Sequence, residues 1–190
     1  MILFVGLGNP GNRYENNRHN IGFKVVDALV DHYEAQNISK STFHGELFKS
    51  NELLFLKPTT FMNLSGKSVQ AVKNFYKIEL DSTIVIHDDL DLHFGAVRFK
   101  NGGGHGGHNG LRSIDSMIGK EYTRVRMGIG KPLHKSQVTE HVLGDFSALE
   151  CEVLDRWITH VADACRTIPH ERLETVKSRE SLKSFESLGT

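Results

Sequence analysis

The sequence predicts an α/β fold in a single globular domain. Apolar runs typical of buried strands alternate with segments of helical periodicity, which is the pattern of a layered α/β domain. The length of 190 residues fits one domain, and 38% hydrophobic and 24% charged residues are ordinary for a globular protein. Repeats and composition breaks are absent from the sequence. We therefore expect one domain over residues 1–190, with residues 170–190 as a charged, helical and peripheral C-terminal segment.

The chain begins with a segment typical of a buried central strand. Residues 2–7 are apolar apart from one glycine. Residues 8–18 are rich in glycine and asparagine, and we expect a loop there. Asn20 is placed to cap a helix. The apolar residues that share one face of this helix are Ile21, Val25, Leu29 and Tyr33.

Two strands and a second helix are expected next. Residues 43–57 contain two strand-like pieces with a turn at Ser50 and Asn51, and Pro58 ends the second piece. Ser65 is placed to cap the following helix. The residues expected on its buried face are Val69, Val72 and Phe75.

The middle of the chain alternates strands with one short helix. Residues 83–87 are rich in β-branched side chains and predict a buried strand that leads into the acidic loop 88–91. A strand over 97–100 and a glycine loop over 101–108 follow. Residues 109–118 predict a helix, whose apolar face holds Leu111, Ile114 and Ile118.

A strand with one polar face and a long helix complete the expected fold. In residues 122–129, Arg124 and Arg126 alternate with apolar side chains. Ser147 and Glu150 have the spacing of a capping box, which predicts the start of a long helix. Its expected buried residues are Leu149, Val153, Trp157, Val161 and Cys165.

Charge is balanced overall but not along the chain. Lys+Arg 23 against Asp+Glu 23 gives no net charge, which excludes a generally basic nucleic-acid coat protein. Residues 92–139 nevertheless hold eight basic and two acidic residues, a local charge of +6, and six of the 18 glycines lie within 101–110. Two interpretations stay open: a face that binds a polyanion, or uneven solvation of an ordinary surface.

Cysteine content and hydropathy exclude further classes of protein. Cys151 and Cys165 cannot form a disulfide framework, and the sequence has no CxxC pair for zinc. The longest clean apolar run, residues 1–5, is too short to span a membrane and lacks the basic start of a signal peptide. We expect a cytoplasmic protein without membrane association.

Two glycine motifs match nucleotide-binding patterns only in part. Residues 6–11 read GLGNPG and fit GxGxxG after a strand, but Pro10 has no N–H for a pyrophosphate and no helix begins at the third glycine. The more economical interpretation is a tight turn that exposes Asn9. Ser65-Gly66-Lys67-Ser68 lacks the P-loop's first glycine, since Phe61 stands there. A nicotinamide-dependent oxidoreductase remains an alternative that NADH titration would test.

Histidines and carboxylates suggest either a metal site or metal-free hydrolysis. His87, His105 and His108 are candidate metal ligands, although their spacing matches no established zinc motif. The sequence contains no GxSxG nucleophile motif, so a hydrolase of this kind would use water as its nucleophile. Such chemistry needs a base, a group that orients it, and neutral donors. Suitable side chains on expected loops are those of His19, Asp88, Asn9, Asn63 and Asn109.

Four blocks of sequence resemble the bacterial peptidyl-tRNA hydrolase family. They are GLGNPGNRYENNRHNIGF (6–23), KPTTFMNLSGKSV (57–69), HDDLDLHFGAVRFKNGGGHGGHNGLRSI (87–114) and RVRMGIGKP (124–132). Their order and spacing, and the length of the chain, are those of the family. Two positions depart from the usual pattern: Asp89 stands where glutamate is frequent, and Lys131 where histidine is frequent. The resemblance is loose beyond about residue 133.

The resemblance implies a fold, an activity and roles for individual residues. It implies a mixed central sheet flanked by helices in a monomer that uses no metal or cofactor and needs no obligate protein partner. The activity would be hydrolysis of the ester between a peptide and the 3′-terminal ribose of tRNA. His19 would be the general base, Asp88 its orienting carboxylate, and Asn9 the residue that distinguishes blocked from free aminoacyl groups. Contacts to the tRNA end or the peptidyl ester would come from Tyr14, Phe61, Met62, Asn63 and Asn109, and a phosphate clamp from Lys100 and Arg126.

Two alternatives from other classes stay open. A non-catalytic RNA-binding protein on the same fold would lack the histidine–aspartate pair, whereas His19 and Asp88 are both present. A metallohydrolase would lose its activity in EDTA. Which asparagine binds the oxyanion and which holds the water is left undecided by the sequence.

Overall fold

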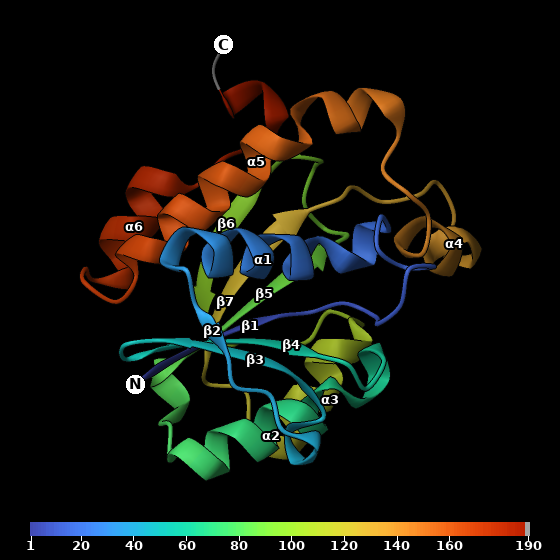
Figure 1. Cartoon of the computed structure of the whole chain (residues 1–190). Coiled ribbons are helices and arrows are strands. Elements are labelled where there is room, and N and C mark those ends of the chain that lie inside the picture. The colour runs from blue at the N-terminus through green and yellow to red at the C-terminus, as the bar shows by residue number, and fades with distance from the viewer. Residues whose placement is uncertain (189–190) are drawn as a thin grey trace.

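A seven-stranded sheet forms the centre of the computed structural model, which describes residues 1–188 (Figure 1). The strand order is β2-β3-β4-β1-β5-β7-β6. β4, β1, β5 and β7 run parallel, whereas β2, β3 and β6 pair antiparallel with their neighbours. The strands are β1 (Ile2–Gly6), β2 (Gln36–Asn37), β3 (Gly45–Ser50), β4 (Leu53–Pro58), β5 (Thr83–Asp89), β6 (Val97–Asn101) and β7 (Thr123–Gly128). The α/β class and the mixed sheet are thereby confirmed.

Helices cover both faces of the sheet. α1 and α5 pack together on one face, and α2 and α3 pack together on the other (Figure 1). The helices are α1 (Ile21–Tyr33), α2 (Ser65–Tyr76), α3 (Asn109–Ile118), α4 (Val138–Val142), α5 (Ala148–Thr167) and α6 (Leu173–Glu180). Short 3-10 turns precede α1, α2 and α4, at Arg18–Asn20, Met62–Leu64 and Lys135–Gln137.

The two helical layers explain why β1 is apolar on both sides. Phe4 belongs to the core cluster beneath α1 and α5, where Trp157 is fully buried. Leu3 and Val5 belong to the cluster beneath α2 and α3. A strand buried on both faces has no polar alternation, as the sequence of residues 2–7 predicted.

The two expected helix caps are confirmed only in part: Asn20 occupies the N-cap position of α1 without a capping hydrogen bond, whereas Ser65 is not the N-cap of α2. The Asn20 side chain makes no cap to α1; its Oδ1 accepts from Asn9 N at 2.9 Å, and its Nδ2 donates to Asn9 O at 2.9 Å. Ser65 is the first residue of α2, and its hydroxyl donates to Met62 O. The capping box of Ser147 and Glu150 at the start of α5 is confirmed.

Three side chains were placed on the wrong side of their elements. Phe75 is 55% exposed and Leu149 is 76% exposed: both lie near helix ends, and Phe75 is covered only in part, by Phe43 and Lys40. Arg124 was expected on a polar face, yet it is buried, because it donates to the Gly103 and Gly104 carbonyls of the glycine loop and to Asp115 of α3.

A close contact between two glycines brings α1 against the ends of the central strands. A Cβ on Gly22 would lie 2.4 Å from Ile86 O, and a Cβ on Gly6 would lie 2.2 Å from Gly22 O. Only glycine permits this approach. It places the residues just before α1 beside the carboxyl end of β5.

The C-terminal segment lies along the edge strand β6. Leu182 exchanges two backbone hydrogen bonds with Val97, and Val176 of α6 is fully buried. Residues 189–190 of the segment defined from the sequence lie outside the described part of the chain. Within residues 1–188, no helix has the combined length and apolarity needed to cross a membrane.

Candidate active site

A cavity of about 570 Å³ opens at the carboxyl edge of the parallel strands. Ligand sites of α/β sheets characteristically lie at this edge. The cavity brings together nine of the ten side chains selected from the sequence, namely Asn9, His19, Phe61, Met62, Asn63, Asp88, Lys100, Asn109 and Arg126. The tenth, Tyr14, does not line the cavity, but its ring lies edge-on to Phe61 at 6.2 Å.

The carboxylate of Asp88 joins two histidines at the bottom of the cavity. Asp88 stands at the end of β5, where it is 2% exposed. His19 Nδ1 lies 3.0 and 2.9 Å from its two oxygens, and His108 Nε2 lies 2.8 Å from Oδ1. Because a carboxylate only accepts hydrogen bonds, both of these ring nitrogens carry protons. His19 therefore keeps Nε2 free to accept a proton.

His108 is held in one tautomer by the helix that follows it. Its Nδ1 accepts from the backbone N–H groups of Gly110 and Leu111, at 3.1 and 3.3 Å, and so caps α3. Acceptance at Nδ1 leaves the single ring proton on Nε2, which points at Asp88. The start of α3 thus fixes the direction of the second hydrogen bond to the carboxylate.

Electrostatics keep Asp88 ionised and a neighbouring histidine neutral. Burial alone would raise the pKa of Asp88, but His19 and His108 outweigh it and hold that pKa well below its usual range. Burial, helped by the nearby His108 ring, lowers the pKa of His87 to about 4. His87 Nδ1 donates to the backbone carbonyl oxygen of Asp88 at 2.8 Å, so a neutral ring contacts the residue that carries the carboxylate.

Asn9 is fixed by backbone contacts on both sides. Its main chain exchanges two hydrogen bonds with the Asn20 side chain, as described above, and its Oδ1 accepts from Met62 N at 2.7 Å. With Oδ1 occupied, the group that Asn9 offers to a ligand is its NH2 donor. The loops after β1 and β4 are thereby locked to the start of α1.

Phe61 stands at the cavity rim in a strained conformation. Its φ of 64° and ψ of 156° lie in a region that only glycine adopts easily. Phe61 is 52% exposed, and its ring packs against Tyr14. A bulky side chain in such a position typically costs ~1–3 kcal/mol, which is characteristic of binding sites.

The histidine–carboxylate set also has the composition of a metal site. His19, Asp88 and His108 each place one ligand atom within 4.8 Å of the others. The nitrogens that face Asp88 are protonated, however, and a protonated nitrogen has no lone pair for a metal. Of the sequence candidates, His108 belongs to this cluster, whereas His105 is half-buried and its Nδ1 accepts from Gly107 N. The geometry fits a hydrogen-bonded chain better than a ligand set.

Comparison with known proteins identifies the family. The family model described as peptidyl-tRNA hydrolase matches residues 3–187. The peptidyl-tRNA hydrolase of Sulfurovum sp. (strain NBC37-1) is 64% identical over 188 residues, which cover 99% of this chain and 100% of that protein. The corresponding protein of Sulfurimonas denitrificans is 56% identical and covers 97% of this chain, with 98% of its own length matched. The chain belongs to the peptidyl-tRNA hydrolase family.

A solved structure agrees with this assignment. The crystal structure of peptidyl-tRNA hydrolase from Acinetobacter baumannii has a TM-score of 0.92 and 38% identity, covering 97% of this chain and 96% of that one. The chain is accordingly an enzyme of the peptidyl-tRNA hydrolase class, and the family predicted from its four sequence blocks is confirmed.

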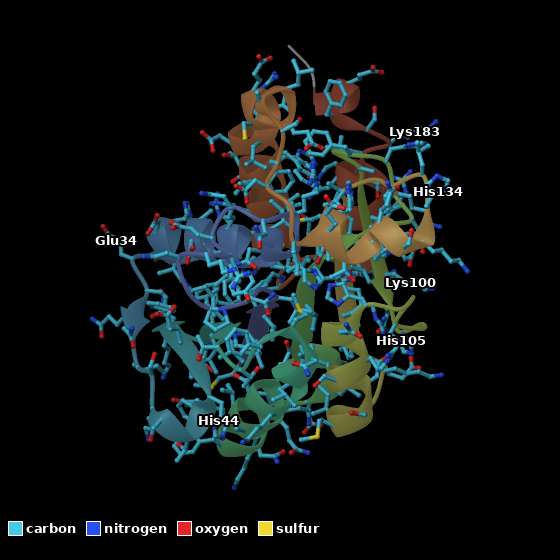
Figure 2. All side chains as sticks on the ribbon, turned by 90° about the vertical axis from the view of Figure 1, so that its right-hand side faces the viewer. Glu34, His44, Lys100, His105, His134 and Lys183 are labelled. Carbon is cyan, nitrogen blue, oxygen red and sulfur yellow. The ribbon has the colours of Figure 1, made fainter. Side chains whose placement is uncertain are left out.

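The side of this peptidyl-tRNA hydrolase that holds the cavity also carries basic groups. Figure 2 shows Lys100, His105, His134 and Lys183 along one side of the molecule, opposite Glu34. Lys100 is exposed, whereas Arg126 is half-buried and donates from Nε to Asp89 at 2.8 Å. Asp89 therefore holds the Arg126 guanidinium in place beside the cavity.

Sequence reasoning missed three residues that shape the site. His108 was considered only as a metal ligand, and Asn20 only as a helix cap. Arg124 lines the cavity and donates to the carbonyls of Gly103 and Gly104 at 2.8 and 2.7 Å. The position of His108 directly before the helix at 109–118 is the signal that could have revealed its capping role.

Proposed function

We propose that this enzyme hydrolyses the peptide–ribose ester of peptidyl-tRNA by direct attack of water, with His19 as general base. The single observation that carries the proposal is the hydrogen bond from His19 Nδ1 to the Asp88 carboxylate. With its proton on Nδ1, the ring of His19, which lines the cavity, has Nε2 available as a base. A neutral imidazole with an unprotonated ring nitrogen can accept a proton from water.

The reaction balances with water as the only co-reactant. The water oxygen forms a bond to the ester carbonyl carbon while its proton passes to His19 Nε2. The bond to the ribose oxygen then breaks, and that oxygen takes the proton back from His19. Asp88 stays ionised throughout and stabilises the imidazolium.

Neutral amides are the donors we propose for the ester. Asn63 and Asn109 line the same cavity as His19, and either can donate to the oxyanion or hold the water. Asn9 presents its NH2 group, which suits the acyl-amide oxygen that a blocked aminoacyl group has and a free one lacks. Tyr14, Phe61 and Met62 would contact the tRNA end or the peptide.

The tRNA is expected to lie on the basic side shown in Figure 2. Lys100 and Arg126 would bind a phosphate, a contact that does not depend on nucleotide sequence. We further infer that the protein acts as a monomer in the cytoplasm, where peptidyl-tRNA is produced, without metal, cofactor or obligate partner.

Hydrolysis of N-acetylated aminoacyl-tRNA by His19→Ala tests the proposal. We expect kcat to fall by about 10²- to 10⁴-fold while tRNA binding persists. His32→Ala is the matched control, because His32 is an exposed histidine of α1 outside the cavity. Unblocked aminoacyl-tRNA and a simple ester should be poor substrates. Hydrolysis by His19→Ala at the rate of the control would remove His19 from the role of base, and loss of all activity in EDTA would favour a metallohydrolase.

A further inference from the structure

The helix α4 forms one wall of the cavity, which the glycine loop also lines. Val138, Thr139, Val142 and Leu143 line the cavity from this side. The wall is short, because α4 spans only Val138–Val142; its His141 Nε2 donates to Ile129 O at 3.0 Å just past β7, and Val142 packs against the core. Figure 1 shows α4 beside the start of α1, which is where His19 lies. Its position depends on what holds the segment between α4 and α5.

Arg18, the neighbour of His19, makes several contacts to this segment. Its Nη1 donates to His141 O at 3.2 Å, and its Nη2 donates to Glu150 Oε1 at 2.8 Å. Its backbone N–H donates to Gly144 O at 3.0 Å, and its guanidinium lies over the Phe146 ring at 5.9 Å. One side chain thus contacts the end of α4, the connecting segment and the first turn of α5.

A second residue, Asn17, joins the chain before α1 to the segment between α4 and α5. Asn17 forms a β-bridge with Asp145, and its Nδ2 donates to Asp145 Oδ1 at 2.9 Å. Glu150 meanwhile accepts from Ser147 N at 2.8 Å, so the carboxylate that binds Arg18 also completes the cap of α5. The side chains of Arg18 and Glu150 are 14% and 18% exposed, which shields their ion pair from solvent.

We propose that Arg18 is a positioning residue that couples the α4 wall to the general base, so that the wall and His19 keep one fixed separation across the cavity. The inference rests on the proposed function of His19. Arg18 does not line the cavity and acts through its neighbours. The planar guanidinium is required because its two terminal nitrogens donate to a carbonyl and to a carboxylate at the same time. A lysine has one terminal nitrogen in place of these two.

Three variants separate positioning from simple stabilisation. Arg18→Met removes both side-chain hydrogen bonds, to His141 O and to Glu150. Arg18→Lys keeps the charge for Glu150 but cannot also reach His141 O. Glu150→Gln keeps an amide oxygen for Arg18 and for the helix cap. Lys57→Met is the matched control, because Lys57 is a largely buried cation whose ion pairs with Asp27 and Glu46 lie outside the cavity.

The readouts are kcat and KM on N-acetylated aminoacyl-tRNA, the pH profile of kcat, and amide hydrogen exchange over residues 138–143. We expect kcat/KM to fall by about 100-fold in Arg18→Met and by about tenfold in Arg18→Lys, with less than about threefold change in Glu150→Gln. Exchange over 138–143 should accelerate in both Arg18 variants, and the pH profile of Arg18→Met should shift. Lys57→Met should change the melting temperature only.

Two outcomes would overturn the inference. One is kinetic constants and exchange rates of Arg18→Met and Arg18→Lys that match the wild type. The other is a loss of kcat/KM in the Arg18 variants that is no larger than the loss in Lys57→Met for the same decrease in melting temperature. Failure of the proposed function is a separate result, since it would show in the wild type and in His19→Ala whatever the Arg18 variants do.

Discussion

Asp88→Asn perturbs the hydrogen-bonded chain in the cavity at its centre. The native carboxylate accepts from both His19 and His108, whereas an asparagine side chain has one acceptor oxygen and one NH2 donor. His108 cannot change tautomer without losing the two N–H groups that its Nδ1 accepts from α3. The amide oxygen must therefore serve His108, and the NH2 group faces His19.

The expected loss of activity follows from the tautomer of His19. Facing an NH2 donor, His19 Nδ1 becomes the acceptor and the ring proton moves to Nε2, the atom that should take the proton of water. In a Ser-His-Asp triad the same change lowers kcat by about 10⁴-fold. We expect a loss of about 10²- to 10⁴-fold here, or roughly 3 to 5 kcal/mol of transition-state stabilisation at ~1.36 kcal/mol per factor of ten.

Single-turnover hydrolysis of N-acetylated aminoacyl-tRNA measures this loss without a contribution from product release. The sharper test repeats Asp88→Asn in a His108→Ala background, where the amide oxygen is free to turn toward His19. The cost of Asp88→Asn should then shrink by about tenfold or more. An Asp88→Asn enzyme within tenfold of the wild type, or an equal cost in the two backgrounds, would refute the tautomer argument.

Three further outcomes are expected. Lys100→Ala and Arg126→Ala should raise KM and flatten its salt dependence by roughly one phosphate contact each, with little change in kcat; a large fall in kcat at unchanged salt slope would contradict the clamp. Phe61→Gly should unfold in urea with a free energy about 1 kcal/mol above that of Phe61→Ala, since only glycine relieves the positive φ; the reverse order would exclude strain. Stability should fall by on the order of 3 kcal/mol as the pH drops from 6.5 to about 4, because unfolded His87 binds a proton in this window and folded His87 does not; His87→Gln, compared by urea unfolding at both pH values, should show a smaller fall, and an equal fall would count against the shift.

The elements with strong local patterns were predictable from the sequence. The helix over 109–118 has the predicted bounds, because its apolar spacing is regular and glycines precede it. Phe75 and Leu149 were misplaced for a physical reason: helical periodicity gives the angle of a side chain around the axis, but not whether another element covers that part of the helix. Strand alternation likewise could not show that β7 is covered on both faces.

The predicted side chains of the site were largely brought together, but their connections could not be foreseen. His108 reaches Asp88 because four glycines at 102, 103, 106 and 107 take positive φ and fold the loop back over the sheet. Arg18 and Glu150 are separated by 132 positions, and no local pattern predicts their ion pair. The catalytic roles of the predicted side chains, and the positioning role of Arg18, stay predictions.

The pairing of Leu182 with Val97 has a consequence for association between molecules. β6 is the outermost strand, and an uncovered outer strand offers unpaired N–H and C=O groups to the backbone of another chain. Leu182 occupies such groups of Val97, while α6 packs alongside. The segment from α6 to Leu182 therefore protects this strand from pairing with another molecule, and a protein shortened ahead of Leu182 would be prone to aggregate through it even with its cavity intact.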